Sequence, residues 1–144
     1  MTLNVLKLER FKLIFEGEHL NGKKWNGKGY NDNGNIVYEI ENGKGYIKEY
    51  NKEGKFIFEG EYLNGERNGK GKEFYDEKLI FEGEYLNGER NGKGKEFYDN
   101  NKLKFEGEYL NGKRWNVKEY NVKGNFEYEI KNGTGYIKEY DFFW

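Results

Sequence analysis

The sequence lacks several residue types on which much protein chemistry depends. It contains no cysteine, proline, serine or alanine. Without cysteine there is no disulfide and no thiolate chemistry, and a hydroxyl nucleophile would have to come from Thr2 or Thr134. The absence of proline leaves strand hydrogen bonding uninterrupted, and the absence of alanine disfavours helix. These absences argue against an enzyme with a nucleophilic side chain and against a helical fold.

The charges balance almost completely, and long apolar runs are missing. The 25 basic and 26 acidic residues give a net charge of -1, so the chain has no strong field to attract nucleic acid or anionic lipid. We expect no nucleic-acid partner, and the net charge does not favour membrane lipid. Charged residues interrupt the N-terminal stretch MTLNVLKLERFKLIF, which therefore lacks the apolar region of a secretion signal. The sequence predicts a cytoplasmic protein.

Aromatic residues supply most of the apolar surface that the chain can bury. Hydrophobic residues make up only 35% of the sequence and the mean hydropathy is -1.16, but 19% of the residues are aromatic. These rings recur at regular intervals, unlike the composition of a disordered chain. We therefore expect an ordered protein without a thick globular core.

The chain is an array of repeats. The stretch FEGEYLNGERNGKGKEFYD occurs at 58–76 and again, without change, at 81–99, and residues 16–50 align without gaps on residues 106–140. We predict an N-terminal capping strand at 1–14 and an aromatic tail or cap at 141–144. Between them lie about six units, near 15–35, 36–57, 58–80, 81–104, 105–125 and 126–140.

Each unit has the pattern of a β-hairpin. In FEGEYL, alternation places Phe58, Gly60 and Tyr62 on one side of a strand and the two glutamates on the other. Asn64-Gly65 and Asn68-Gly69 tolerate the positive φ angles that reversing turns demand, so both pairs are interpreted as turns. The segment from Lys70 to Tyr75 is then the returning strand.

Hairpins of this kind, placed side by side, predict an all-β fold. We expect an elongated, twisted, single-layer antiparallel sheet of about six consecutive hairpin repeats. One side would carry ladders of rings as the core, and the other would carry cross-strand pairs of glutamate and lysine. The phenylalanine ladder consists of Phe15, Phe58, Phe81 and Phe105; the tyrosine ladder consists of Tyr62, Tyr85 and Tyr109.

The repeated pattern resembles the MORN repeat. Its Phe58-x-Gly60-x-Tyr62 segment, followed by Gly65, Gly69 and Gly71, is similar to the family consensus of two aromatics around a glycine and a closing G-x-G. The unit at Phe15 has His19 in the second aromatic place, and the unit at Phe105 has Val117 and Glu119 in place of the closing glycines. The resemblance implies hairpin repeats with roles in interaction or scaffolding, in some cases at membranes. The chain is also similar to bacterial arrays of related repeats described as antitoxin-like.

The candidates for catalysis or metal binding are weak. His19, the sole histidine, occupies a place that holds tyrosine in sister units, which indicates a ring in a ladder rather than a ligand. The glutamate pairs, such as Glu59 and Glu61, could serve a glycosidase, but a pair that recurs in four units is not specialised for catalysis. The loop at 31–35 lacks the ligand pattern of a calcium site, and 65–70 lacks that of a phosphate loop. We predict no catalytic residue, no metal and no cofactor.

Binding is the function that remains. We expect a non-enzymatic protein-binding or scaffolding module that presents the aromatic side of its sheet, with a protein partner or self-association as a homodimer. The alternatives are a peripheral membrane module that binds phospholipid and an antitoxin-like repeat protein. The candidate contact residues are Trp25, Trp115, Tyr62, Tyr85, Tyr109, Phe142, Phe143 and Trp144.

Overall fold

The computed structural model describes residues 12–136, and all regular secondary structure within this range is β-strand. The predicted capping strand at 1–14 lies outside the described residues except for 12–14, and the aromatic tail at 141–144 lies wholly outside them. The twelve strands are β1 (Phe15–Leu20), β2 (Lys23–Tyr30), β3 (Ile36–Ile40), β4 (Gly45–Tyr50), β5 (Phe56–Leu63), β6 (Glu66–Tyr75), β7 (Lys78–Leu86), β8 (Glu89–Phe97), β9 (Leu103–Leu110), β10 (Lys113–Tyr120), β11 (Phe126–Lys131) and β12 (Thr134–Gly135).

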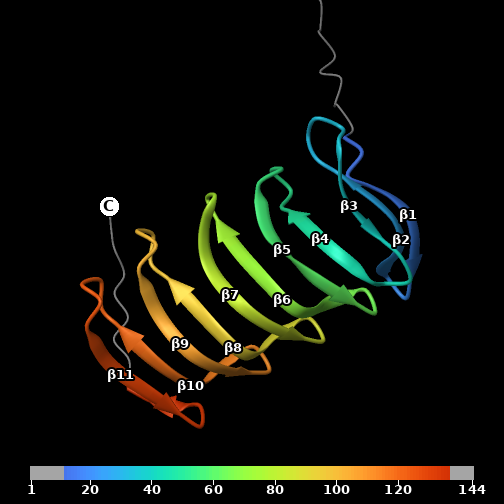
Figure 1. The fold of residues 1–144 in the computed structure, drawn as a ribbon. Coiled ribbons are helices and arrows are strands. Elements are labelled where there is room, and N and C mark those ends of the chain that lie inside the picture. Colours follow the sequence, from blue (N-terminus) through green and yellow to red (C-terminus); the bar gives the residue numbers. More distant parts are fainter. Residues whose placement is uncertain (1–11, 137–144) are drawn as a thin grey trace, which may run out of the picture.

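The strands lie side by side in chain order (Figure 1). All ladders are antiparallel, which confirms the predicted all-β array of hairpins. The ladder is interrupted once: β1 to β3 form a three-stranded sheet and β4 to β12 a nine-stranded sheet. At this interruption β3 and β4 meet through a single bridge, between Glu41 and Lys44.

Asparagine-glycine turns close the hairpins at one end of the strands. Asn64 and Gly65 have φ angles of 54° and 75°. Positive φ at both central positions is the mark of a type I′ turn. The second predicted turn, Asn68-Gly69, is wrong: it lies inside β6, where Gly69 has a φ of 94° in a β-bulge opposite Glu61. The returning strand accordingly starts at Glu66 rather than at Lys70.

Side chains of asparagine shape several turns at the opposite end. Asn31 Oδ1 accepts hydrogen bonds of 3.0 Å from the backbone N–H groups of Asn33 and Asn35. Asn51 and Asn121 make the same pattern. The loop at 31–35 is therefore a turn stabilised by its first asparagine.

A row of glycines crosses the nine-stranded sheet and lets the rings lie against the backbone. The row consists of register partners on consecutive strands: Gly60, Gly71, Gly83, Gly94 and Gly107. A Cβ atom on Gly71 would lie 2.7 Å from the ring of Phe58. The row continues at its two ends with Ile47, Val117 and Ile130, whose buried side chains fill the layer there.

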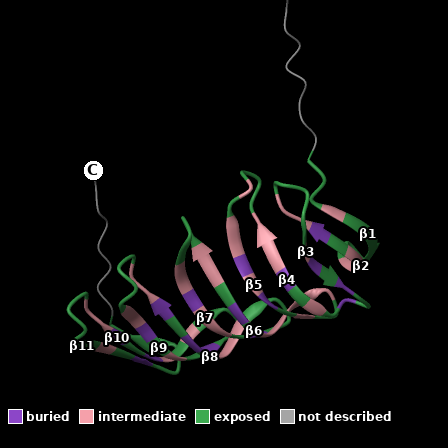
Figure 2. Cartoon of the chain, turned by 45° about the horizontal axis from the view of Figure 1, so that its top comes forward, coloured by how far each residue is buried: buried purple, intermediate pink, exposed green. Residues whose placement is uncertain are grey.

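The core is thus a single layer of side chains on one side of the sheet. Phe58 and Phe81 are 0% exposed and Phe105 is 2% exposed. Tyr85 meets Phe58 edge-on, with ring centroids 5.4 Å apart. Figure 2 shows the buried residues as short segments within the strands, separated by exposed ones. A second cluster, of Tyr38, Ile40 and Ile47, lies beside the interruption between the sheets.

Candidate binding surfaces

The side of the sheet that carries Phe58, Phe81 and Phe105, here called the aromatic side, is covered by arginine. The guanidinium carbon of Arg67 lies 4.0 Å from the ring centroid of Phe58. Arg90 lies 3.9 Å from Phe81, and Arg114 lies 3.7 Å from Phe105. The planar guanidinium shields each ring from water and gains a cation–π interaction. These arginines explain how a single-layer sheet buries its phenylalanines completely.

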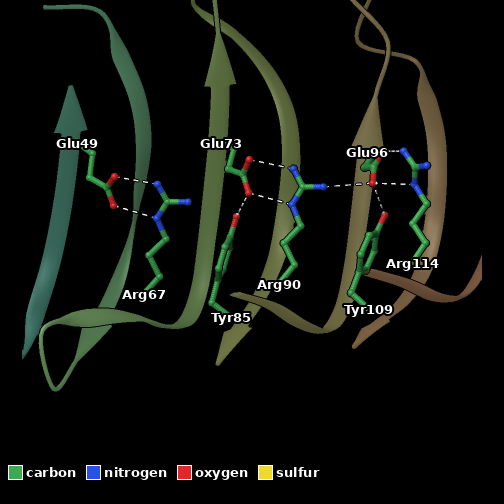
Figure 3. A network of polar contacts seen from close by, with 8 residues as sticks. All are labelled: Glu49, Arg67, Glu73, Tyr85, Arg90, Glu96, Tyr109 and Arg114. Carbon is green, nitrogen blue, oxygen red and sulfur yellow. Dashed lines mark hydrogen bonds and ion pairs between the residues drawn. The ribbon is translucent and has the colours of Figure 1, made fainter. Parts of the chain in front are cut away.

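Glutamates from preceding strands hold the arginines in place. Arg67 donates to both carboxylate oxygens of Glu49, at 2.9 and 2.8 Å. Arg90 makes the same two-pronged contact with Glu73, at 2.9 Å for both bonds, and also reaches Glu96 at 3.2 Å. Figure 3 shows the resulting series, in which Arg90 joins two carboxylates and Glu96 in turn joins Arg90 to Arg114. An arginine–carboxylate pair with two parallel hydrogen bonds fixes the relative orientation of the two groups in addition to pairing their charges.

The tyrosine ladder completes each of these contacts. The hydroxyl of Tyr62 donates to Glu49, that of Tyr85 to Glu73 and that of Tyr109 to Glu96. Burial alone would raise the pKa of Glu49, but the hydrogen bonds from Arg67 and Tyr62 outweigh it and lower the pKa. Burial, followed by the hydrogen bond to Glu73, raises the pKa of Tyr85 above its ordinary value. The carboxylates of Glu49 and Glu73 are therefore held charged, and the three tyrosines are held neutral.

The aromatic side is thus less open than the sequence predicts. Tyr85 and Tyr109 are buried and Tyr62 is half-buried, so these three rings belong to the packed layer. What this side presents to solvent above the rings is the layer of arginine and glutamate. Phe142, Phe143 and Trp144 lie outside the described residues.

The two candidate tryptophans pack against glycines in neighbouring turns. Trp25 is the extra residue of the bulge between β1 and β2, and Trp115 has the same place between β9 and β10. The backbone O of Trp25 accepts from the N–H of Gly43 at 2.9 Å, and a Cβ on Gly43 would lie 2.5 Å from the indole ring. Trp115 contacts Gly133 in the same way. Both indoles remain partly accessible, and their contact with a partner stays a prediction.

The opposite side of the sheet carries a row of alternating charges, here called the charged row. Each member is the register partner of the next, and the sign changes at every strand. The row runs Lys48, Glu59, Lys72, Glu82, Lys95, Glu106, Lys118 and Glu129. Because neighbouring strands are about 4.8 Å apart, charges of like sign recur roughly every 10 Å.

A trough of about 1030 Å³ lies on this charged side. Its walls include six of the row's members, from Lys72 to Glu129, and its lining includes the glycine backbone at Gly71, Gly83, Gly94 and Gly107. Tyr46 stands at the trough and is 54% exposed. Burial and the nearby carboxylates of Glu59 and Glu61 raise the pKa of Tyr46, so its hydroxyl stays a hydrogen-bond donor.

Other features of the described chain offer less. A second cleft, of about 680 Å³, lies at the interruption between β3 and β4 and is lined by Lys24, Tyr38 and Tyr62 among others. No group of three or more histidine, aspartate or glutamate side chains in residues 12–136 is arranged to hold a metal ion. Within the same range, no helix is long and apolar enough to span a membrane.

These features define a class, an open array of β-hairpin repeats with polar surfaces on both sides of one sheet. The MORN repeat family model matches residues 58–77, 81–102 and 105–116. These residues are therefore MORN repeats, as the sequence predicts. MORN repeats in general are non-catalytic modules associated with binding to proteins or membrane lipids. A search of curated proteins finds no sequence that matches this chain.

The prediction from sequence missed Tyr46 and the three arginines. Arg67, Arg90 and Arg114 each follow an asparagine-glycine turn by two residues, and this recurrence is visible in the sequence. Because that position lies opposite the ladder tyrosine across the hairpin, it could have been assigned to the aromatic side.

Proposed function

We propose that this chain is a non-enzymatic protein-binding module whose main contact surface is the trough. The observation that carries the proposal is the charged row, in which lysine and glutamate alternate over eight consecutive strands. Equal numbers of both signs give no net attraction for an anionic membrane or a nucleic-acid backbone. A partner with both signs of charge in matching order gains from such a row.

The spacing of the row favours one shape of partner. An α-helix has a pitch of 5.4 Å, close to the 4.7–4.9 Å between strands. A helix lying across the strands would therefore present about one turn to each strand. We infer a helical segment that carries acidic and basic side chains on alternate turns of one face. Tyr46 supplies an exposed aromatic anchor, of the kind that dominates many interfaces.

A pair of synthetic helical peptides tests this proposal. One peptide alternates lysine and glutamate on successive turns of a single face, and the control has the same composition with the signs separated into two blocks. Fluorescence anisotropy with the full chain should detect binding of the alternating peptide and at least about tenfold weaker binding of the control. Equal affinity for both peptides, or no binding of either, would contradict the proposal.

Matched variants locate the contact. Lys72→Glu reverses a charge in the trough, whereas Lys78→Glu makes the same change at an exposed residue outside its lining. We expect only the first to weaken peptide binding. A photoreactive benzoylphenylalanine at Tyr46 should cross-link the peptide, whereas one at Tyr75, which is exposed outside the trough, should not. Flotation with phosphatidylserine vesicles tests the lipid alternative; vesicle binding without peptide binding would favour it.

A further inference from the structure

The outer edge of β1 is incompletely covered. In the sheet order β1 has one neighbour, β2, so its other edge is unpaired among residues 12–136. Leu13 and Ile14, which precede it, are 55% and 69% exposed, whereas their counterparts Leu79 and Ile80 before β7 are half-buried. Phe15 is only half-buried, although its counterparts in later units are 0–2% exposed. A strand edge with unpaired backbone groups and exposed apolar residues beside it is a template for another strand.

The sequence contains a second copy of the strand that covers the equivalent edge elsewhere in the fold. The edge of β5, with sequence FEGEYL at 58–63, is covered by β4, with sequence GYIKEY at 45–50. Residues 135–140 repeat GYIKEY without change, and β1 reads FEGEHL, one residue different from FEGEYL. Residues 135–140 and β1 thus have the sequences of the two strands that meet at the β4–β5 junction, with one difference at His19.

The register of the β4–β5 junction can be carried over residue by residue. Lys48 is the partner of Glu59, which places Lys138 opposite Glu16. Within the chain, Glu16 is the partner of Lys28, and Lys28 that of Glu39. Joining Lys138 to Glu16 therefore gives alternating charges in the order Lys138, Glu16, Lys28 and Glu39 across the junction and the first three strands.

We propose that residues 135–140 of one copy add as a strand to the β1 edge of a second copy, in the register of the β4–β5 junction, and so join copies head to tail. The two contacting surfaces differ, so the first and the last copy of an assembly each keep one surface unused. Such a heterologous contact does not close after two copies and generates open chains. The proposal does not rest on the trough's function, because it concerns strand edges rather than the side of the sheet.

Sedimentation of the full chain over a range of concentrations tests the proposal. The weight-average mass should rise with concentration past that of a dimer, in steps of the 17.2 kDa protomer. A dimer of fixed mass would overturn the proposal. A monomer at every concentration would overturn it too.

Charge-reversed variants test the register. Glu16→Lys and Lys138→Glu each place like charges opposite one another at the junction, and each should weaken association about fivefold. Mixing the two variants should restore association, because every junction between unlike variants again pairs opposite charges. Glu106→Lys is the control, since Glu106 is the counterpart of Glu16 on the interior strand β9. Circular dichroism checks that each variant is folded. Weakening by Glu106→Lys equal to that by Glu16→Lys, or a mixture that fails to associate, would overturn the proposal.

Discussion

The central units and the first unit begin with strands that differ at one residue, FEGEYL and FEGEHL, but bury their phenylalanines to different extents. In the unit at Phe81, Arg90 covers the ring, and it is held by Glu73 of the preceding unit and by Glu96 of its own strand. In the unit at Phe15 the corresponding residue is Lys24, whose ammonium lies 5.0 Å from the ring and donates to Tyr38. The comparison teaches that burial in this fold depends on contacts between units, so a hairpin at an edge is less stable than its sequence suggests.

Among the changes that test this comparison, removal of a central ring should have the largest effect on stability. Phe81→Ala should lower the free energy of unfolding by about 4 kcal/mol, because it removes a fully buried ring. Phe15→Ala should cost about half as much, because part of the ring is already exposed. Urea denaturation followed by circular dichroism measures both. Equal losses would show that the two units are equally well packed.

Removal of the covering arginine comes next. Arg90→Ala leaves the carboxylates of Glu73 and Glu96 with fewer partners and uncovers Phe81. The expected loss is about 3 kcal/mol, whereas Lys24→Ala should cost less than about 1 kcal/mol. The same denaturation experiment applies, and a loss for Lys24→Ala as large as that for Arg90→Ala would contradict the role given to arginine.

The glycine row gives a third, intermediate effect. A methyl group on Gly94 would lie 2.7 Å from the ring of Phe81 and 3.0 Å from that of Tyr109, so Gly94→Ala should cost about 2 kcal/mol. Val117 continues the same row on β10 and is buried. Val117→Gly should also destabilise, by a similar amount, because it leaves a cavity and frees the backbone. If Gly94→Ala were neutral, the rings would not lie against the backbone in solution.

The pH dependence of stability should follow the ladder of carboxylates and tyrosines. The pKa values of Glu49 and Glu73 are lowered from 4.5 in the folded chain, so their contribution to stability is present above that pH and is lost as the pH falls below it. The pKa of Tyr85 is raised from 10.0, so its contribution is lost as the pH rises above that value. Thermal unfolding between pH 3 and 11 should show a plateau between these limits. Arg90→Gln should make the acid decline shallower, whereas Lys24→Gln should change it less, because Lys24 is the smallest of the causes that lower the pKa of Glu49.

The smallest effect concerns the connection between the two identical units. Glu77, in the turn between β6 and β7, has a φ of 65°, a conformation that costs side chains other than glycine about 1 kcal/mol. Glu77→Gly should raise stability by about 0.5 kcal/mol after the added flexibility of the unfolded chain is counted. Any loss in urea denaturation would show that the Glu77 side chain stabilises the turn.

The sequence predicted the repeating parts of this fold because they depend on local alternation. The placement of Phe58 and Tyr62 on one side, and of glutamate opposite lysine on the other, needs only the period of a strand. The arginine layer was missed because two asparagine-glycine pairs flank Arg67, and interpreting both as turns left it no position on a strand. Only the β-bulge at Gly69 distinguishes the second asparagine-glycine pair, which lies within a strand, from the first, which forms a turn.

Features that depend on position within the array could not be predicted in this way. The identical glutamates and glycines of neighbouring units give no sign that the ladder is interrupted between β3 and β4. Glu73 and Glu82 are both strand glutamates, but the first binds Arg90 on the aromatic side and the second lines the trough. The side that each glutamate faces follows from alternation along its strand, but its partner follows from the register across strands, which the sequence of one unit does not specify.

The sequential strand order also bears on how the chain folds. Each ladder joins strands that adjoin one another in the chain, so every loop that closes during folding is short. Sheet proteins are slow to fold when their strands pair over long separations, and this one avoids that delay. Hairpins can form one after another as the chain leaves the ribosome, each adding to an edge already in place. For the same reason, duplication of one unit inserts two strands without altering any other pairing, as the identical stretches at 58–76 and 81–99 illustrate.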